Sequence, residues 1–410
     1  MAHLDHIAAG FLPLTDCAIL VAAREIGFAE DEGIDLALVR ETSWANIRDR
    51  MAVGHFEAAH MLAPMPVAAN LGLTPMPAEL VAPMALGLGG NAVTVSTKVW
   101  NEMRVDEPLD IRDPDAIGAQ LKRVIETRKK AGDDRLRFGV VHPHSGHNLE
   151  LRYWLDACAI APDTDIEIVI VPPPLMADAL KNGRIDGFCV GEPWNSIAVD
   201  MGVGRIATVK AAIWRSSPEK VLTLRSEWQR DHEELTSRLL RALHRAAEWC
   251  GDVKNKDKLA AILARDTYVS APKELVERAL SGNLVLEQGL DIALPDFFLP
   301  FERAATFPWQ SHALWFYSQL VRWGIAPHNQ DNATRARQSY RPDLYRRALK
   351  PLRAGLPSAN AKVEGALERE TPVGATHGTL VLGPDGFFDG RVFDPDKLDD
   401  YVAGSLQSPA

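Results

Sequence analysis

Short apolar segments alternate with amphipathic segments through roughly the first two hundred residues of the chain. The apolar segments are the length of strands, several are rich in β-branched residues, and the segments between them have the spacing of amphipathic helices. We expect strands at residues 7–13, 34–39, 57–62, 91–96, 137–141, 167–171 and 186–190. Strands alternating with helices predict an α/β protein with a mostly parallel sheet that is covered by helices on both faces. In such a sheet, ligands bind where strands end and helices begin.

The pattern becomes helical after about residue 225. Residues 234–250 place leucines and alanines on one face, which predicts an amphipathic helix. Residues 309–323 are dense in aromatic side chains, and we expect a buried helix there rather than a partner surface. The basic segment 335–353 is interrupted by prolines, which favours a solvated helical face over a nucleic-acid patch. Residues 357–376 have the composition of a linker or wrapping arm.

Composition limits the kinds of ligand that the overall charge can attract. The 410 residues include 45 basic and 55 acidic side chains, a formal net charge of −10. This length predicts two or three domains, and this charge opposes a generic nucleic-acid binder. The four cysteines form no Cys-x-x-Cys pair, so we expect reduced thiols. An overall negative field also repels small anions, so an anion site in this chain has to be built locally.

Targeting signals are not evident in the printed sequence. The first residues lack a basic region, an apolar region and a small-residue cleavage site. No segment approaches the roughly 18 uninterrupted apolar residues that a membrane-spanning helix requires. We therefore expect a cytoplasmic protein.

Three junctions between an expected strand and an expected helix carry candidate ligand groups. Thr42 or Ser43 can cap a helix that starts at Trp44. His147 follows a Ser-Gly pair that allows a tight helix entry, and free N–H groups at a helix start favour a negative charge. Gly191 allows close backbone approach just before Pro193, a residue suited to a first helical turn. Together these junctions favour an anion-binding or polar-ligand crevice over an enzyme.

Each candidate also has a structural interpretation. Trp44 alone is typical of a core side chain, and Lys220, which enters an apolar segment, is by default a surface charge. His142, His144 and His147 raise the possibility of zinc, but their spacing and the lack of a nearby cysteine or carboxylate cluster disfavour it. The glycines at 87–90 lack the spacing of a dinucleotide loop. Paired carboxylates for hydrolysis and a Gly-x-Ser-x-Gly elbow are not evident.

Several motifs resemble the nitrate- and bicarbonate-binding proteins of ABC transporters. The most specific is Phe-Cys-Val-Gly-Glu-Pro-Trp-Asn at 188–195, with a triple proline upstream at 172–174. Others lie at 10–16, 41–49, 59–66, 152–155, 218–220 and 393–395, so the resemblance covers nearly the whole chain. It implies a two-lobed periplasmic-binding-protein-like fold of type II, with the ligand in a cleft between the lobes. Lobe one would comprise residues 1–92 and 225–356, lobe two residues 93–224, and residues 357–410 would form a C-terminal wrapping tail.

The resemblance also implies a ligand set. Matched one position at a time, the family's tryptophan, histidine, glycine and lysine correspond to Trp44, His147, Gly191 and Lys220. The family's glutamine position holds Asn91, which is one methylene shorter, and the loop before His147 differs from the Gly-Thr-His that we expect. Bicarbonate binders of the family carry an acidic residue at the lysine position, so Lys220 favours nitrate or nitrite. No cofactor and no metal ion are expected.

The function implied by the resemblance depends on location. Without a leader, the chain resembles the cytoplasmic nitrate/nitrite sensors (NasS-type) of bacterial nitrate assimilation, which control an RNA-binding antiterminator protein. The sensor role is therefore our first expectation, with no direct contact to nucleic acid or membrane. A solute-binding receptor of a nitrate or bicarbonate ABC transporter is the alternative. A thiamine-pyrimidine-synthase-like enzyme is a minor alternative, because the chain lacks that enzyme's cysteine-rich iron motif.

Overall fold

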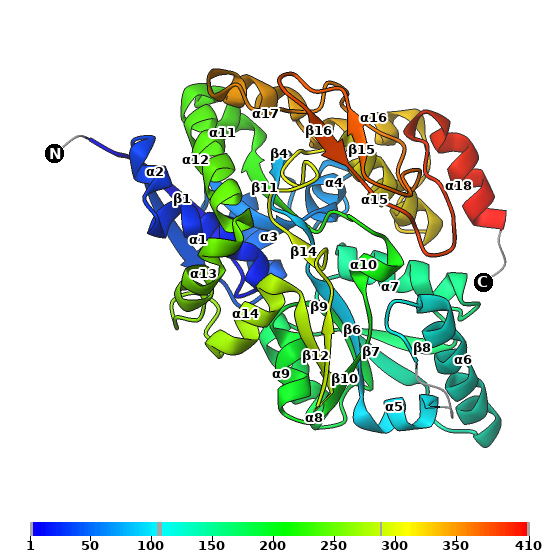
Figure 1. Ribbon diagram of the computed structural model, residues 1–410. Helices are drawn as coiled ribbons and strands as arrows, with labels where there is room; N and C mark the ends of the chain where they lie inside the picture. The colour runs from blue at the N-terminus through cyan, green and yellow to red at the C-terminus, as the bar shows by residue number, and fades with distance from the viewer. Residues whose placement is uncertain (1–2, 105–108, 288, 408–410) are drawn as a thin grey trace.

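Two five-stranded sheets form the centres of two lobes (Figure 1). The computed structural model describes residues 3–104, 109–287 and 289–407. The order in the first sheet is β2 (Ile34–Arg40), β1 (Asp5–Phe11), β3 (Ala58–Leu62), β11 (Lys220–Arg225) and β4 (Leu80–Ala85). The order in the second is β10 (Gly204–Val209), β6 (Asn91–Ser96), β9 (Gly187–Gly191), β7 (Leu136–Val140) and β8 (Ile166–Ile170). The α/β prediction and the positions of the expected strands are confirmed.

One strand in each sheet runs against its neighbours. β11 is antiparallel to β3 and β4, and β6 is antiparallel to β9 and β10. β6 is the first strand of the second sheet after the chain leaves the first, and β11 is the strand by which it returns. Neither β6 nor β11 is joined to a neighbouring strand of its own sheet by a strand–helix–strand crossover, the connection that makes neighbouring strands parallel. The expectation of one mostly parallel sheet is therefore wrong in detail: the chain has two mixed sheets.

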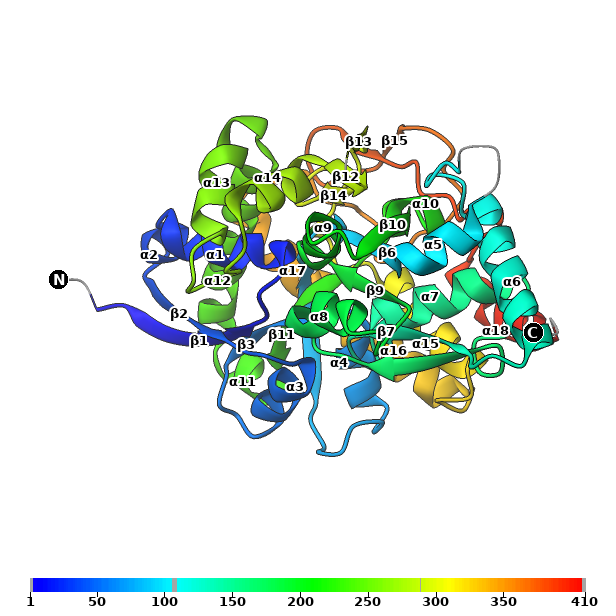
Figure 2. The same cartoon turned by 90° about the horizontal axis from the view of Figure 1, so that it is seen from below.

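Helices cover both sheets (Figures 1 and 2). The first lobe holds α1 (Ala18–Glu25), α2 (Phe28–Asp31), α3 (Trp44–Ala52), α4 (Pro64–Asn70), α11 (Ser226–Asp231), α12 (Glu233–Gly251), α13 (Lys256–Leu263), α15 (Gln310–Arg322), α16 (Gln330–Ser339) and α17 (Pro342–Leu349). The second holds α5 (Thr97–Met103), α6 (Pro114–Ala131), α7 (Gly146–Ala157), α8 (Met176–Lys181), α9 (Trp194–Asp200) and α10 (Lys210–Ile213). α14 (Lys273–Ser281) lies close to α13 on one side and to α9 on the other.

Outside the two main sheets, the described residues form three two-stranded ladders. They are β5 (Leu88–Gly89) with β14 (Phe298–Leu299), β12 (Asn283–Glu287) with β13 (Leu290–Ala293), and β15 (Thr371–Val373) with β16 (Leu380–Leu382). The chain crosses between the main sheets after β4 and again after β10. The predicted lobe boundaries stay a prediction, and their outer ends, residues 1 and 410, lie outside the described residues. None of the helices in the described ranges has the length and apolar character to cross a bilayer.

Local sequence signals explain the helix ends that matter for the site. The hydroxyl of Ser43 accepts a hydrogen bond from the backbone N–H of Asn46, and Ser145 does the same for Asn148. These caps start α3 at Trp44 and α7 at Gly146. α9 starts at Trp194, with Pro193 in the capping position rather than in the first turn. The aromatic helix α15 is buried as predicted: Trp315, Phe316 and Tyr317 are 0% exposed.

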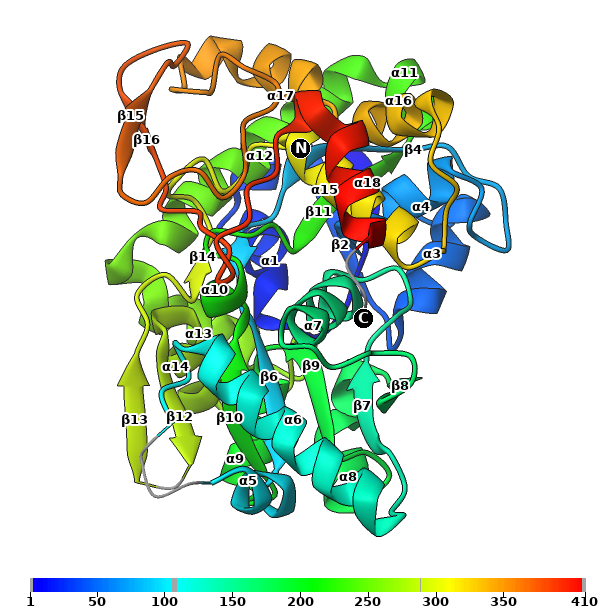
Figure 3. The same cartoon turned by 90° about the vertical axis from the view of Figure 1, so that its right-hand side faces the viewer.

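The C-terminal segment from residue 357 contacts both lobes (Figure 3). Half-buried Lys362 forms ion pairs with Glu364 and Asp385, and the Ser311 hydroxyl on α15 donates to Glu364. In the second lobe, the ring of Phe387 stacks on Trp214, and the Tyr153 hydroxyl donates to Asp389. The final helix, α18 (Leu398–Gln407), packs on α15. The segment therefore bridges the two lobes, and the extent of a C-terminal wrapping tail stays a prediction.

Candidate functional site

Lys220, the first residue of β11, stands at the centre of a buried ionic cluster. It is 0% exposed, and its Nζ lies 2.8 Å from Asp16 Oδ2 and 2.8 Å from Glu219 Oε1. The same Nζ lies 5.5 Å from the ring centroid of Trp44, within cation–π range. Lys220 is therefore a core ammonium held by two carboxylates and one aromatic ring, not a surface charge.

Trp44 reaches this cluster because its helix begins there. The Ser43 cap places the ring in the first turn of α3, where it is buried and 5.4 Å from the ring of His60 on β3. His60 Nε2 lies 2.9 Å from Asp16 Oδ1. Burial lowers the pKa of His60, and Asp16 offsets only part of that shift. The first lobe thus supplies one contiguous wall of the site, made of Trp44, His60, Asp16 and Lys220.

The second lobe supplies the opposite wall. Asn91 and Gly191 are direct partners in the antiparallel register of β6 and β9. A Cβ atom at Gly191 would lie 3.0 Å from Leu14 Cδ2, 3.2 Å from Asn91 Oδ1 and 3.4 Å from Asp16 Oδ2. A larger residue would therefore crowd the site, and the glycine lets the two lobes approach.

His147 enters from the first turn of α7. Its Nδ1 lies 3.3 Å from Glu219 Oε1, and the side chain is 0% exposed. Burial lowers the pKa of His147 to about 3, and Lys220 and Lys210 add to this shift while Glu219 opposes it. The imidazole is therefore neutral at physiological pH.

Glu219 connects the cluster to a second lysine. Lys210 Nζ lies 2.5 Å from Glu219 Oε2, 2.9 Å from Glu150 Oε1 and 2.7 Å from the carbonyl oxygen of Pro218. Burial acts to raise the pKa of Glu219, but His147, Lys210 and Lys220 outweigh it and hold that pKa well below its usual range. Burial raises the pKa of Glu150 to about 8 despite Lys210. At neutral pH, Glu219 is therefore ionised and Glu150 is mostly protonated.

Several buried polar atoms around Lys220 have no hydrogen-bond partner among the described residues. They are Trp44 Nε1, His147 Nε2, and both Oδ1 and Nδ2 of Asn91. Buried polar groups are rarely left unpaired, and each such group costs about 1–3 kcal/mol. They come from three elements and surround one ammonium, an arrangement that provides donors for a small polar or anionic ligand.

The structure thus brings Trp44, Asn91, His147, Gly191 and Lys220 into one buried cluster between the lobes, and their contacts with a ligand stay a prediction. Sequence reasoning missed Asp16, His60, Lys210 and Glu219, which hold the cluster together. The available signal was a charged or ionisable residue inside an apolar segment, as at His60 within 58–62 and Lys210 after Val209.

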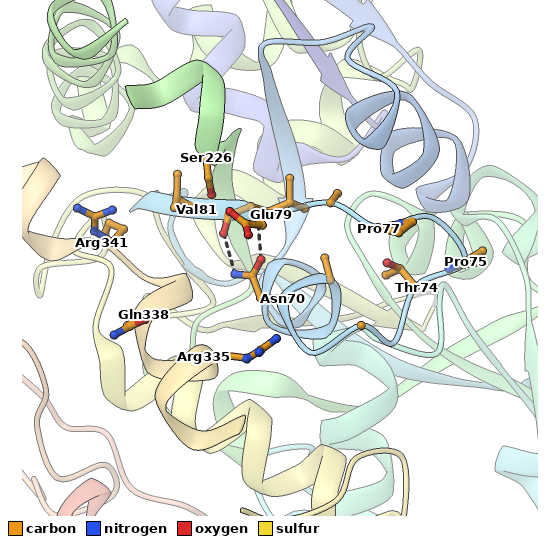
Figure 4. A pocket seen from close by; sticks show the side chains of 14 residues that line it. Asn70, Thr74, Pro75, Pro77, Glu79, Val81, Ser226, Arg335, Gln338 and Arg341 are labelled. Atoms are coloured by element: carbon orange, nitrogen blue, oxygen red, sulfur yellow. Dashed lines mark hydrogen bonds between the residues drawn. The ribbon is translucent and has the colours of Figure 1, made fainter. Parts of the chain in front are cut away.

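A separate groove of about 970 Å³ opens on the first lobe, next to α4 and α16 (Figure 4). Arg335, Gln338 and Arg341 line one side. The amide of Asn70 is bonded to the backbone of Leu80 and the hydroxyl of Ser339, and Arg341 pairs with Asp343. The groove shares no residue with the Lys220 cluster. Because Asn70 and Arg341 already have protein partners, fewer polar groups in the groove are free to bind a ligand.

The three histidines near α7 do not form a metal cluster. His142 Nδ1 accepts a hydrogen bond from the backbone N–H of His144, while His147 turns toward Glu219. Over residues 3–104, 109–287 and 289–407, no group of three or more histidine, cysteine or carboxylate side chains has metal-binding geometry.

Two lobes that enclose a buried ionic cluster define a ligand-binding protein of the periplasmic-binding-protein type. The chain belongs to the NMT1-like family, whose model matches residues 2–264. It is close to the NrtA nitrate-binding proteins of ABC transporters. The nitrate/nitrite-binding protein NrtA of Synechococcus elongatus is 34% identical over 97% of this chain and 85% of its own length.

Further comparisons bear on the fold. The periplasmic nitrate-binding protein NrtA from Synechocystis PCC 6803 superposes with a TM-score of 0.85 and 26% identity, covering 98% of both chains. The nitrate import ATP-binding protein NrtC of Synechocystis is 37% identical over 84% of this chain, which corresponds to 50% of NrtC. A zinc-bound ligand-binding component of an ABC import system from Staphylococcus aureus shares the fold alone, with a TM-score of 0.63 and 16% identity. The two-lobed fold predicted from the resemblance is confirmed.

Proposed function

We propose that this chain binds nitrate or nitrite in the buried cluster around Lys220 and acts as a binding protein rather than an enzyme. The observation that carries the proposal is the set of unpartnered donors on Trp44, Asn91 and His147 beside a buried ammonium. Support comes from the NrtA proteins, whose names specify nitrate or nitrite and which match this chain along nearly its whole length. No cofactor is indicated for these relatives.

The chemistry of the donors fits a small monovalent oxyanion. Nitrate is planar and accepts hydrogen bonds only, so it needs donors arranged around it rather than a mixed set. Lys220, the Asn91 amide and the Trp44 N–H supply such donors, and charge-assisted hydrogen bonds are the stronger ones. The backbone N–H of Gly191 adds a further candidate donor in this proposal.

We propose the receptor of an ABC transporter as the physiological role. The sensor role is the first expectation that the family resemblance raises. The relatives favour the transporter role, since the nearly full-length matches are NrtA proteins. The sensor role, with a cytoplasmic location and an RNA-binding antiterminator partner, is therefore our second proposal.

Isothermal titration calorimetry with nitrate, nitrite and bicarbonate tests the ligand. Lys220→Ala removes the only ammonium in contact with Trp44 among the described residues, and we expect it to weaken nitrate binding about 100-fold, as removal of a charged hydrogen-bond donor does. Lys98→Ala, at an exposed lysine, is the matched control and should bind as the wild type does. Nitrate binding that is unchanged in Lys220→Ala would contradict the site.

Asn91→Leu gives a cleaner test because it does not break an ion pair. Both polar atoms of the Asn91 side chain lack protein partners in the described ranges, so a leucine of similar size removes only unpaired groups. We expect nitrate affinity to fall about tenfold while the free energy of unfolding stays equal or rises. A variant that binds nitrate normally would exclude Asn91 from the ligand set.

The receptor and sensor roles predict different locations and partners. For the receptor, fractionation of the native organism should place the chain outside the cytoplasmic membrane, associated with transporter subunits. For the sensor, the chain should be cytoplasmic and co-purify with an RNA-binding protein in a manner that nitrate changes. A cytoplasmic chain whose complex responds to nitrate would overturn the receptor proposal.

A further inference from the structure

Before any anion is added, the charges of the Lys220 cluster are already balanced. Its two ammonium groups, Lys210 and Lys220, contact two ionised carboxylates, Asp16 and Glu219. Burial acts to raise the pKa of Asp16, but Lys220 and His60 outweigh it and hold that pKa well below its usual range. Glu150 is mostly protonated at neutral pH, as described above. Two positive and two negative charges therefore share a site in which every one of these residues is at most 3% exposed.

An anion entering this site would leave one uncompensated negative charge. Burial of an unpaired charge is strongly unfavourable, and proteins usually avoid it by changing a protonation state. Lys220 does not supply the missing positive charge, because its ammonium already contacts two carboxylates at 2.8 Å. A proton taken up beside the donors restores the balance, and a neutral base that takes it also gains a second N–H for the anion.

His147 is placed for this role. Its Nδ1 lies 3.3 Å from the Glu219 carboxylate, and both ring nitrogens are buried without a hydrogen-bond partner among the described residues, so Nδ1 faces the carboxylate and Nε2 stays open to a ligand. A neutral imidazole carries a single N–H, so it can offer a donor to the carboxylate or to the anion but not to both. Only the imidazolium presents an N–H to each of these acceptors. We infer that the site binds its anion together with one proton, and that His147 takes up this proton; the inference rests on the proposed function.

The groups that face His147 set the direction of this coupling. Glu219 and Asp16 favour the charged ring, whereas Lys220, Lys210 and burial oppose it. In the free protein the opposing effects dominate, and the pKa of about 3 keeps the ring neutral. An anion against Nε2 adds a third negative neighbour and raises the pKa of the ring in the complex. By linkage, nitrate then binds more tightly as the pH falls.

Calorimetry on the full chain measures the proton directly. Nitrate is titrated at about pH 6 in MES and in bis-Tris, two buffers that differ in ionisation enthalpy, and the difference in observed heat gives the number of protons taken up. We expect a value approaching one, and a Kd that rises with pH between about 5.5 and 8 with a limiting slope of tenfold per pH unit. Nitrate binding without proton uptake and with a constant Kd would overturn the inference and leave the proposed function intact. Failure to bind nitrate or nitrite at any pH would overturn both.

Two matched variants assign the proton. His147→Gln keeps a neutral donor but cannot become charged, so it should bind nitrate with no proton uptake and no dependence on pH. His312→Gln alters a buried histidine on α15 that pairs with Glu364 outside the Lys220 cluster, and it should keep the proton uptake of the wild type. Proton uptake that persists in His147→Gln would overturn the assignment. If that variant folds poorly or does not bind, nitrogen NMR of the wild-type His147 ring decides: nitrate should protonate both ring nitrogens, and a ring that stays neutral contradicts the inference.

Discussion

Glu219→Gln is expected to lower the free energy of unfolding by about 3–5 kcal/mol, the usual effect of removing one member of a buried ion network. Glu219 contacts both Lys210 and Lys220 and lies beside His147, and all four side chains are at most 2% exposed. Glutamine keeps the size of the side chain but removes its charge. Lys220 would then keep only the carboxylate of Asp16, and Lys210 only that of Glu150.

Urea unfolding of the full chain measures this change. Glu248→Gln, at an exposed position on α12, is the control and should stay within about 0.5 kcal/mol of the wild type. Combining Glu219→Gln with Lys210→Met removes one charge of each sign, so the double variant should lose less stability than the two single changes added together. A loss below about 1 kcal/mol in Glu219→Gln would show that Glu219 does not hold the two lysines.

Stability is expected to pass through a maximum near pH 6.5 and to fall on both sides. On the acid side, burial lowers the pKa of His142 and His147 to about 3 and of His144 and His244 to about 4. The unfolded chain binds protons at these four histidines below about pH 6.5. The native chain does not, so its stability is lost as the pH falls from about 6.5 toward 3–4.

Two glutamates act in the opposite direction. Burial raises the pKa of Glu150 to about 8 and of Glu192 to about 7, so the native chain holds protons there that the unfolded chain releases above about pH 4.5. Stability from these groups is present below their unfolded pKa and is lost as the pH rises through 7 and 8. Between about pH 4.5 and 6, four histidines outweigh two glutamates, and the net effect is on the order of 3 kcal/mol per pH unit. From pH 6.5 to 8 the glutamates act alone, and the expected loss is about 3 kcal/mol in total.

Thermal and urea unfolding from pH 4.5 to 9 checks this profile. Glu192→Gln is the informative variant, because glutamine can still accept the hydrogen bond from the backbone N–H of Ser196 but does not ionise. It should reduce the loss on the alkaline side, which Glu150 then carries alone, and steepen the rise in stability between about pH 4.5 and 6.5, where Glu192 opposes the histidines. Stability that stays constant or rises between pH 7 and 9 would contradict the raised pKa values of the two glutamates.

Much of the fold follows from local sequence. Apolar segments of strand length became strands, Ser43 and Ser145 capped the helices that they precede, and the aromatic segment at 309–323 became the buried helix α15. These features depend on neighbours within a few residues, which is why periodicity and capping rules reach them. Trp44, His147 and Gly191 were found by the same means, because each lies at a strand-to-helix junction. Lys220 and Asn91 needed the family resemblance, since a lysine or an asparagine beside a strand has no local signature.

By itself, then, the sequence determined the α/β class, the positions of the main strands and helices, and the junctions that carry the candidate donors. Only the tertiary structure decided the direction of β6 and β11, which depends on how the chain crosses between lobes. It also decided the charge state of the site, because Asp16, Lys210, Glu219 and Lys220 come from elements that meet only after both sheets form. Ion pairing and burial act through space, between residues that are far apart in the sequence. A local charge pattern therefore does not show that Lys220, the lysine expected to neutralise an anion, is already paired with two carboxylates.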